Sequence, residues 1–115
     1  MKRTESNEWV LKVDEKGKLV RVGLTYRAAL ELGEVVFVKL PRVGQKTEVN
    51  EEIAILESVK AAVEMYAPLK GTVVAVNERL LTDPDLVTKT AYPEGWLYEI
   101  ELDNEEDYHS LSDLL

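Results

Sequence analysis

Short runs in which apolar and polar residues alternate dominate this sequence. Trp9, Leu11 and Val13 alternate with polar neighbours, which is the period of a strand with one buried face. Turn-forming residues separate the runs and indicate a hairpin loop over residues 14–18 and a strand end at Pro41. The predicted strands cover residues 9–13, 19–24, 34–40, 52–58, 61–67, 72–77 and 97–102.

One internal segment has a helical pattern instead. Thr25 can cap a helix over residues 26–32, because its side-chain oxygen can accept a hydrogen bond from the first turn. Gly33 can end this helix, since glycine readily adopts the backbone conformation that follows a helix. We therefore expect a short helix near residues 26–32.

The C-terminal segment also indicates a helix, over about residues 104–115. Asn104 can cap it, and acidic residues fill the first turn, where the helix dipole favours them. Tyr108, Leu111 and Leu115 would share one face. This pattern predicts a terminal helix that packs on the β-structure.

A weak internal repeat indicates how the strands are arranged. Residues 33–38 read GEVVFV and residues 71–76 read GTVVAV, and each run precedes a loop and a strand that ends in glutamate. Two such units can bury one shared core by facing each other. The sequence therefore predicts a mainly β fold, a flattened sandwich or barrel of two antiparallel sheets with approximate two-fold symmetry.

Length and composition limit the function. A chain of 115 residues suits a single domain, here expected over 1–115 with its core at about 8–102. The net charge of −8 argues against nucleic acid and anionic membranes as partners. The absence of cysteine excludes disulfides and thiolate chemistry, and His109 is the only histidine, so we expect no metal site. No run is apolar enough for a membrane span, and a cytoplasmic protein is expected.

Lys60 occupies the point where the apolar pattern stops and restarts between two predicted strands. A tight turn is expected there, so the ammonium would lie in water, within reach of a modifying enzyme. A solvated ammonium makes a poor base, but it can be acylated when an enzyme supplies the activated donor and the base. The pattern alone leaves two interpretations open, a modified lysine or an ordinary solvated one.

The surrounding motif is more specific. Residues 57–78 read ESVKAAVEMYAPLKGTVVAVNE, which resembles the lipoyl-attachment region of the glycine cleavage system H protein family. Related biotinyl domains typically have Met-Lys-Met at this turn, and dehydrogenase-complex lipoyl domains typically have Asp-Lys-Ala. The resemblance continues through residues 8–10, 23–25, 32–41, 84–87 and 95–97.

This resemblance implies a barrel-sandwich hybrid fold and a lipoyl group in amide linkage to Lys60, flanked by Glu57, Ser58, Val59 and Ala61. It implies a non-catalytic carrier rather than an enzyme. The implied partners are a lipoate ligase or lipoyl transferase, the glycine decarboxylase, the aminomethyltransferase and dihydrolipoyl dehydrogenase. The lipoyl group would carry an aminomethyl group among the last three.

Further acidic and polar residues are candidates for contacts with the carried group. Glu57 and Glu64 flank Lys60 on the two strands, where they could serve recognition or face a cation, or be ordinary solvated residues. The resemblance also implies that Glu8, Thr25 and Glu31 line a cleft for the loaded arm, although Glu31 could equally be a helix surface residue.

Three functional hypotheses follow. The first is a glycine cleavage carrier, and the second is a similar lipoate-binding carrier of another pathway, such as sulfur oxidation with a heterodisulfide-reductase-like complex. The second would account for unusual residues near the cleft, such as Asn7 before Glu8. The third is an unmodified interaction domain. A monomer is expected in each case.

Overall fold

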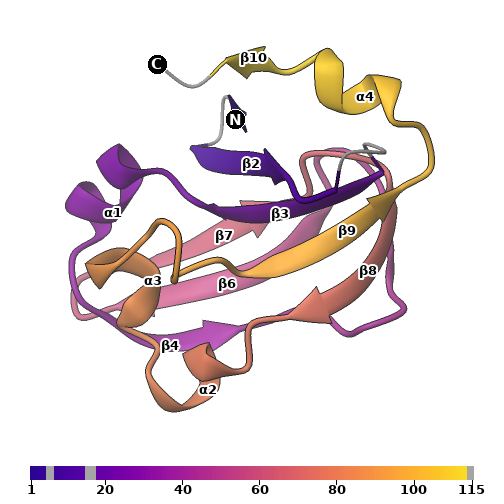
Figure 1. Ribbon diagram of the computed structural model, residues 1–115. Helices are drawn as coiled ribbons and strands as arrows, with labels where there is room; N and C mark the ends of the chain where they lie inside the picture. The colour runs from indigo at the N-terminus through magenta and orange to yellow at the C-terminus, as the bar shows by residue number, and fades with distance from the viewer. Residues whose placement is uncertain (5–6, 15–17, 114–115) are drawn as a thin grey trace.

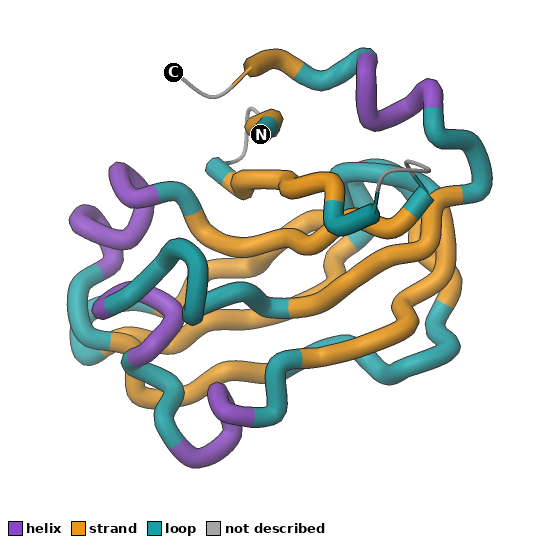
Figure 2. Tube along the Cα trace, viewed as in Figure 1, coloured by secondary structure: helices purple, strands orange, loops and turns teal. Residues whose placement is uncertain are grey.

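Two antiparallel β-sheets face each other in the computed structural model, which describes residues 1–4, 7–14 and 18–113 (Figure 1). The strands are β1 (Lys2–Arg3), β2 (Glu8–Lys12), β3 (Leu19–Leu24), β4 (Val35–Lys39), β5 (Lys46–Thr47), β6 (Glu52–Ser58), β7 (Ala62–Tyr66), β8 (Gly71–Val76), β9 (Tyr98–Leu102) and β10 (Ser112–Asp113). The helices are α1 (Tyr26–Leu32), α2 (Arg79–Thr82), α3 (Leu86–Lys89) and α4 (Glu106–His109). Figure 2 shows that strands and loops form most of the fold.

Sheet order confirms the mainly β prediction. Within the described residues, one sheet has the order β10-β1-β2-β3-β9-β8-β5 and the other has the order β4-β6-β7. The seven strands predicted from alternation correspond to β2, β3, β4, β6, β7, β8 and β9, each end within one residue of the prediction. Of the predicted loop over residues 14–18, residues 15–17 lie outside the described part of the chain.

The internal repeat corresponds to two similar strand pairs. In the first, β4 pairs with β6, and the register shifts between Val35 and Phe37. In the second, β8 pairs with β9, and the register shifts between Val73 and Ala75. These shifts fall at equivalent positions of the two repeats, so both units bend at the same place, as β-bulges do. The approximate two-fold symmetry predicted from sequence therefore extends to the irregularities of the strands.

Helix α1 begins and ends at the predicted residues. The Thr25 side chain accepts a hydrogen bond from the Ala28 backbone N–H at 3.3 Å, which satisfies one of the free donors of the first turn. The Gly33 N–H donates to the Ala29 carbonyl at 3.1 Å. Gly33 has φ 78° and ψ −151°, a combination essentially restricted to glycine. The chain thus turns sharply from α1 into β4.

The predicted C-terminal helix over 104–115 is wrong in extent. Asn104 does accept a hydrogen bond from the Glu106 N–H at 3.0 Å, but α4 covers only Glu106–His109. The chain then forms β10, which pairs with β1 at the N-terminal end. Pairing with a strand more than a hundred residues away thus replaces the local helical pattern. Tyr108 is buried as predicted, whereas Leu115 lies outside the described residues.

The core lies between the sheets, and a buried tryptophan, Trp9, packs closely against the backbone of β3. The Trp9 indole N–H donates to the Ala91 carbonyl at 3.1 Å. Gly23 lies opposite Trp9 in the β2–β3 register, and a Cβ on Gly23 would come within 2.3 Å of the indole ring. Only glycine leaves room for the ring there.

Of the described helices, none is both long and apolar enough to cross a membrane.

Tyr98 is a buried phenol in β9. Its hydroxyl has no hydrogen-bond partner among the described residues. Burial raises the pKa of Tyr98 well above 10.0, and the nearby carboxylate of Glu8 raises it further. The phenol therefore keeps its proton in the folded protein at a pH at which the unfolded chain begins to lose it.

This difference predicts an alkaline loss of stability. The contribution of Tyr98 is fully present below pH 10.0 and is lost as the pH rises above that value, because the unfolded state then releases a proton that the folded state retains. Tyr98→Phe removes the titrating group. Urea unfolding near neutral pH and at about pH 11 should show a smaller alkaline loss for Tyr98→Phe than for the wild type. Equal losses would contradict this assignment.

Candidate functional site

Lys60 lies at the tip of the hairpin that joins β6 to β7. The pairing of Glu57 with Ala62 is the last in register before the tip, and residues 59–61 close the turn. Lys60 and Val59 are both exposed. The hairpin tip lies at the end of the molecule that carries α1 and α3 (Figure 1). The structure thus places Lys60 in a tight, accessible turn.

Ser58 holds this turn with its hydroxyl group. The Ser58 Oγ accepts hydrogen bonds from the Lys60 N–H at 3.2 Å and from the Ala61 N–H at 3.0 Å, and it donates to the Ala61 carbonyl at 3.2 Å. The Ser58 backbone N–H donates to the same carbonyl at 2.7 Å. Serine hydroxyls commonly stabilise turns in this way. The backbone on both sides of Lys60 is therefore fixed by one side chain.

A second contact joins the tip to the loop between α1 and β4. The Val59 N–H donates to the Glu34 carbonyl at 3.2 Å. The Lys60 side chain lies along Gly33: a Cβ built on Gly33 would lie 3.1 Å from the Lys60 Cε and 3.7 Å from its Nζ. The glycine that ends α1 therefore also leaves space for the lysine side chain.

A shallow groove of about 330 Å³ begins at Gly33. It runs between α1 and α3, and its lining residues are Ala29, Leu30, Gly33, Glu34, Asp85, Thr88 and Lys89. The Asp85 Oδ1 accepts hydrogen bonds from the Val35 N–H at 3.3 Å and from the Thr88 hydroxyl at 3.2 Å. Asp85 thereby fixes the start of α3 against the start of β4, which holds the two walls of the groove together.

Glu57 and Glu64 lie on the exposed side of the three-stranded sheet. Glu57 pairs with Phe37 and with Ala62 across its neighbouring strands. Glu64 accepts a hydrogen bond from the Tyr66 hydroxyl at 2.8 Å. This bond and the charge of Glu64 raise the pKa of Tyr66 above its usual value. Among the described residues, neither carboxylate forms an ion pair with Lys60.

The three residues predicted to line a cleft occupy different environments. Glu8 is buried and accepts a hydrogen bond from the Thr4 hydroxyl at 2.9 Å. Thr25 is buried near Glu8, because it follows Leu24, the residue that pairs with Glu8 across the β2–β3 register. Thr25 also caps α1. Glu31 is exposed on α1 and forms a weak ion pair with Arg27 at 3.9 Å. Glu8 and Thr25 thus lie together, while Glu31 lies on the surface at the other end of the helix.

Glu34 and Asp85 were not predicted from the sequence to support the site, and Gly33 was predicted only to end a helix. A glycine after a helix was a usable signal for a left-handed residue. The contact of Gly33 with Lys60 could not be predicted from the sequence, because it joins segments that are far apart in the chain. Likewise, nothing local marks Asp85 as the residue that binds the start of β4.

The site presents a primary amine that can be acylated from outside. Among the described residues, no ion pair engages Lys60, and no group of histidine, aspartate or glutamate side chains could hold a metal ion. The Lys60 amine is therefore accessible to a separate enzyme.

Comparisons with known proteins identify the family of this chain. The family model described as Glycine cleavage H-protein matches residues 1–114. A glycine cleavage system H protein from Psychrobacter sp. (strain PRwf-1) is 47% identical over 111 residues, which cover 96% of this chain and 86% of that protein. The corresponding protein from Thermotoga maritima is 45% identical over 112 residues, covering 97% and 88%.

A solved structure extends the likeness to the fold. The crystal structure of a glycine cleavage system H protein from Mycobacterium marinum matches with a TM-score of 0.80 and 34% identity, covering 88% of this chain and 82% of that chain. The similarity to these relatives thus covers both the sequence and the fold, along most of the chain. The chain belongs to the glycine cleavage H-protein family.

Proposed function

We propose that Lys60 carries a lipoyl group in amide linkage and that the protein is a non-catalytic carrier of aminomethyl groups in glycine cleavage. The observation that carries this proposal is the exposed lysine in a turn fixed by Ser58, within a chain of this family. A lipoate ligase or lipoyl transferase would supply the activated lipoyl carboxyl. The Lys60 ammonium first gives up one proton to a base of that enzyme. Its nitrogen then forms the amide bond and loses a second proton, and the activating group departs from the carboxyl carbon with the bonding electrons.

The lipoyl group fits the chemistry of the chain. Its dithiolane supplies a disulfide that can be opened and closed, which this sequence cannot supply because it contains no cysteine. Attachment replaces an ammonium by a neutral amide, so the net charge becomes one unit more negative than −8. The acidic surface favours partners with basic docking surfaces.

The groove beside Gly33 is a resting place for the attached arm. The Lys60 side chain lies along Gly33, where the groove begins. The apolar side chains of Ala29 and Leu30 can contact the hydrocarbon part of the arm. Glu34 and Asp85 offer carboxylates to a carried aminomethyl cation. Glu8, Thr25, Glu31, Glu57 and Glu64 stay predicted contacts of the arm or of the lipoylating enzyme.

The partners in this proposal are the glycine decarboxylase, the aminomethyltransferase and dihydrolipoyl dehydrogenase. Glycine–bicarbonate exchange with the decarboxylase tests the proposal directly, because exchange requires a carrier that accepts the aminomethyl group. The lipoylated protein should support exchange, and the unmodified protein should not. Absence of exchange with fully lipoylated protein would contradict the glycine cleavage assignment and favour a carrier of another pathway.

The relatives named above favour the first of the three hypotheses, since each is named a glycine cleavage protein. An unmodified interaction domain would also have no need for an accessible lysine in a turn held by hydrogen bonds. The cytoplasmic location and the monomeric state stay predictions.

Ser58→Ala should slow lipoylation about tenfold or less and lower the free energy of unfolding by about 1–2 kcal/mol, because the turn loses hydrogen bonds to three backbone groups. Rates with a purified lipoate ligase and urea unfolding measure the two effects. Ser58→Thr keeps the hydroxyl and should restore most of both. A wild-type lipoylation rate for Ser58→Ala would show that the hydroxyl does not position Lys60.

A further inference from the structure

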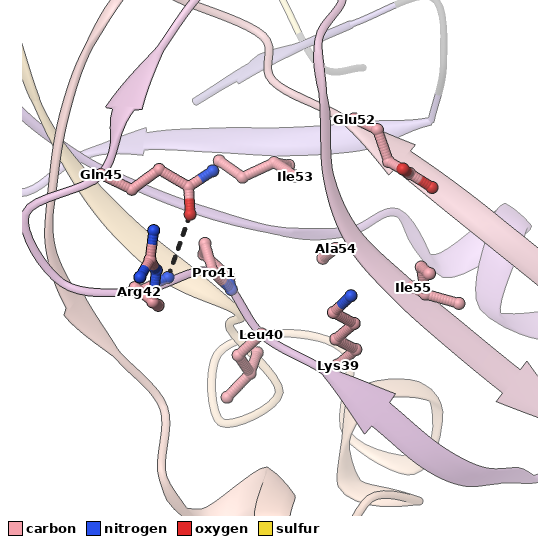
Figure 3. A pocket seen from close by; sticks show the side chains of 9 residues that line it. All are labelled: Lys39, Leu40, Pro41, Arg42, Gln45, Glu52, Ile53, Ala54 and Ile55. Atoms are coloured by element: carbon pink, nitrogen blue, oxygen red, sulfur yellow. Dashed lines mark hydrogen bonds between the residues drawn. The ribbon is translucent and has the colours of Figure 1, made fainter.

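A second cavity lies where β4 separates from β6. The two strands pair as far as Lys39 and Ile55. Continued pairing would bring Pro41 opposite Ile53, but proline has no N–H to donate, so the chain leaves the sheet. The resulting opening between the β4–β5 connection and the start of β6 encloses about 280 Å³ (Figure 3).

The floor of this cavity is apolar. Pro41, Ile53 and Ala54 are buried residues that line it, and Leu40 is half-buried beside them. The cavity is slightly smaller than the roughly 300–1,000 Å³ typical of small-molecule sites. A ligand must therefore be small, and part of it must be hydrocarbon to contact this floor.

The rim of the cavity carries two cations. Lys39 and Arg42 line the cavity, and neither forms a salt bridge within the described residues, although acidic residues outnumber basic ones by 22 to 14 in the whole chain. The Gln45 Oε1 accepts a hydrogen bond from the Arg42 backbone N–H at 3.2 Å, which fixes the loop. The Gln45 amide nitrogen is then available as a further donor, on the side of Ile53 (Figure 3).

The one acidic residue of the lining points elsewhere. Glu52 pairs across the sheet with Tyr66, and its charge contributes to the raised pKa of the Tyr66 phenol. Figure 3 shows its carboxylate directed away from Arg42 and Gln45. The other charged side chains of the lining, Lys39 and Arg42, are cations, and the Gln45 amide adds a donor.

We propose that this cavity is a binding site for a small organic carboxylate with a short hydrocarbon chain. Lys39, Arg42 and Gln45 would bind the carboxylate through charge-assisted hydrogen bonds, and the floor would contact the chain. The net charge of −8 opposes the approach of any anion, so these local contacts must supply the selectivity.

The proposal is independent of the function of Lys60. Val35 pairs with Ser58 beside the hairpin tip, and Lys39 begins the cavity four residues further along β4. At the usual rise of a strand, this separation is about 13 Å. A carboxylate could therefore bind whether or not Lys60 is modified, and loss of one activity would leave the other unchanged.

Titration of the ¹⁵N-labelled protein with sodium butyrate, followed by amide chemical shifts, tests the proposal at constant ionic strength. Saturable shifts should concentrate at residues 39–45 and 52–55, and butyramide, which lacks the charge, should cause none. Inorganic phosphate, which lacks the hydrocarbon, should bind more weakly. Equal binding of phosphate and butyrate would overturn the assignment to a carboxylate with a hydrocarbon chain.

Charge variants complete the test. Lys39→Gln and Arg42→Gln should each weaken butyrate binding about tenfold, the usual effect of losing one charge-assisted hydrogen bond. Both side chains are exposed, so the fold should persist, and amide shifts elsewhere check this. Lys70→Gln makes the same charge change beside Glu48, outside the cavity, and should bind like the wild type. Unsaturable shifts, or equal loss in all three variants, would overturn the proposal.

Discussion

Lys60→Arg is expected to accept no lipoyl group and to support no glycine–bicarbonate exchange, while it keeps the wild-type fold. Arginine retains the positive charge and has a side chain at least as long as that of lysine, but its guanidinium is a poor nucleophile toward an activated carboxyl. The Lys60 side chain is exposed, and no hydrogen bond or ion pair engages its Nζ within the described residues, so its loss should hardly change the free energy of unfolding. Intact-protein mass after incubation with lipoate ligase measures the first effect.

Lys70→Arg is the matched control for this substitution. Lys70 is also exposed and lies between β7 and β8. Its Nζ lies 4.0 Å from a carboxylate oxygen of Glu48. This variant should be lipoylated at the wild-type rate. Full lipoylation of Lys60→Arg would mean that another lysine carries the group, and unfolding of that variant would mean that the side chain has a structural role.

Gly33→Ala is expected to lower the free energy of unfolding by about 1–3 kcal/mol, because its φ of 78° and ψ of −151° are strained for any residue with a Cβ. The added methyl would also contact the Lys60 Cε and narrow the entrance to the groove. Lipoylation should therefore slow as well. Urea unfolding and ligase kinetics measure both effects on the same preparation.

Gly44→Ala separates strain from contact. Gly44 has φ 94°, so alanine is strained there too, but a Cβ at this position would meet no atom within 4 Å. We expect both variants to be less stable than the wild type. Lipoylation should be slower in Gly33→Ala than in Gly44→Ala. Equal rates for the two variants would show that the contact between Gly33 and Lys60 does not matter for the reaction.

Local patterns were sufficient to predict most of the fold. Strand alternation and turn residues act over a few positions, so β6 and the helix after Thr25 could be placed from sequence. The repeat of residues 33–38 at 71–76 predicted two similar units, and the matched register shifts of β4 and β8 agree with it.

Pairing between distant segments could not be predicted in this way. Strand β10 replaces the end of a helical pattern only because β1 offers it a partner, and the ion pair of Lys2 with Asp113 at 2.8 Å depends on the same approach. The hydrogen bond that Lys2 donates, and then its positive charge, lower the pKa of Asp113. Short elements such as α2 and α3 have too few residues to show a helical period.

The site, too, has a part that local sequence predicts and a part that depends on distant segments. The turn position of Lys60 and its flanking serine could be read from a few neighbouring residues. The support from Gly33, Glu34 and Asp85 depends on how α1, β4 and α3 meet, which no local pattern encodes. The predicted cleft residues illustrate the limit: Glu8 and Thr25 are neighbours, but Glu31 faces solvent.

Peptide mass mapping of the protein isolated from its native host tests the lipoyl attachment most directly. The peptide containing Lys60 should carry the added mass of one lipoyl group, and the other lysines should be unmodified. An unmodified Lys60 in cells whose other lipoyl proteins are fully loaded, or a lipoyl group on a different lysine, would contradict it.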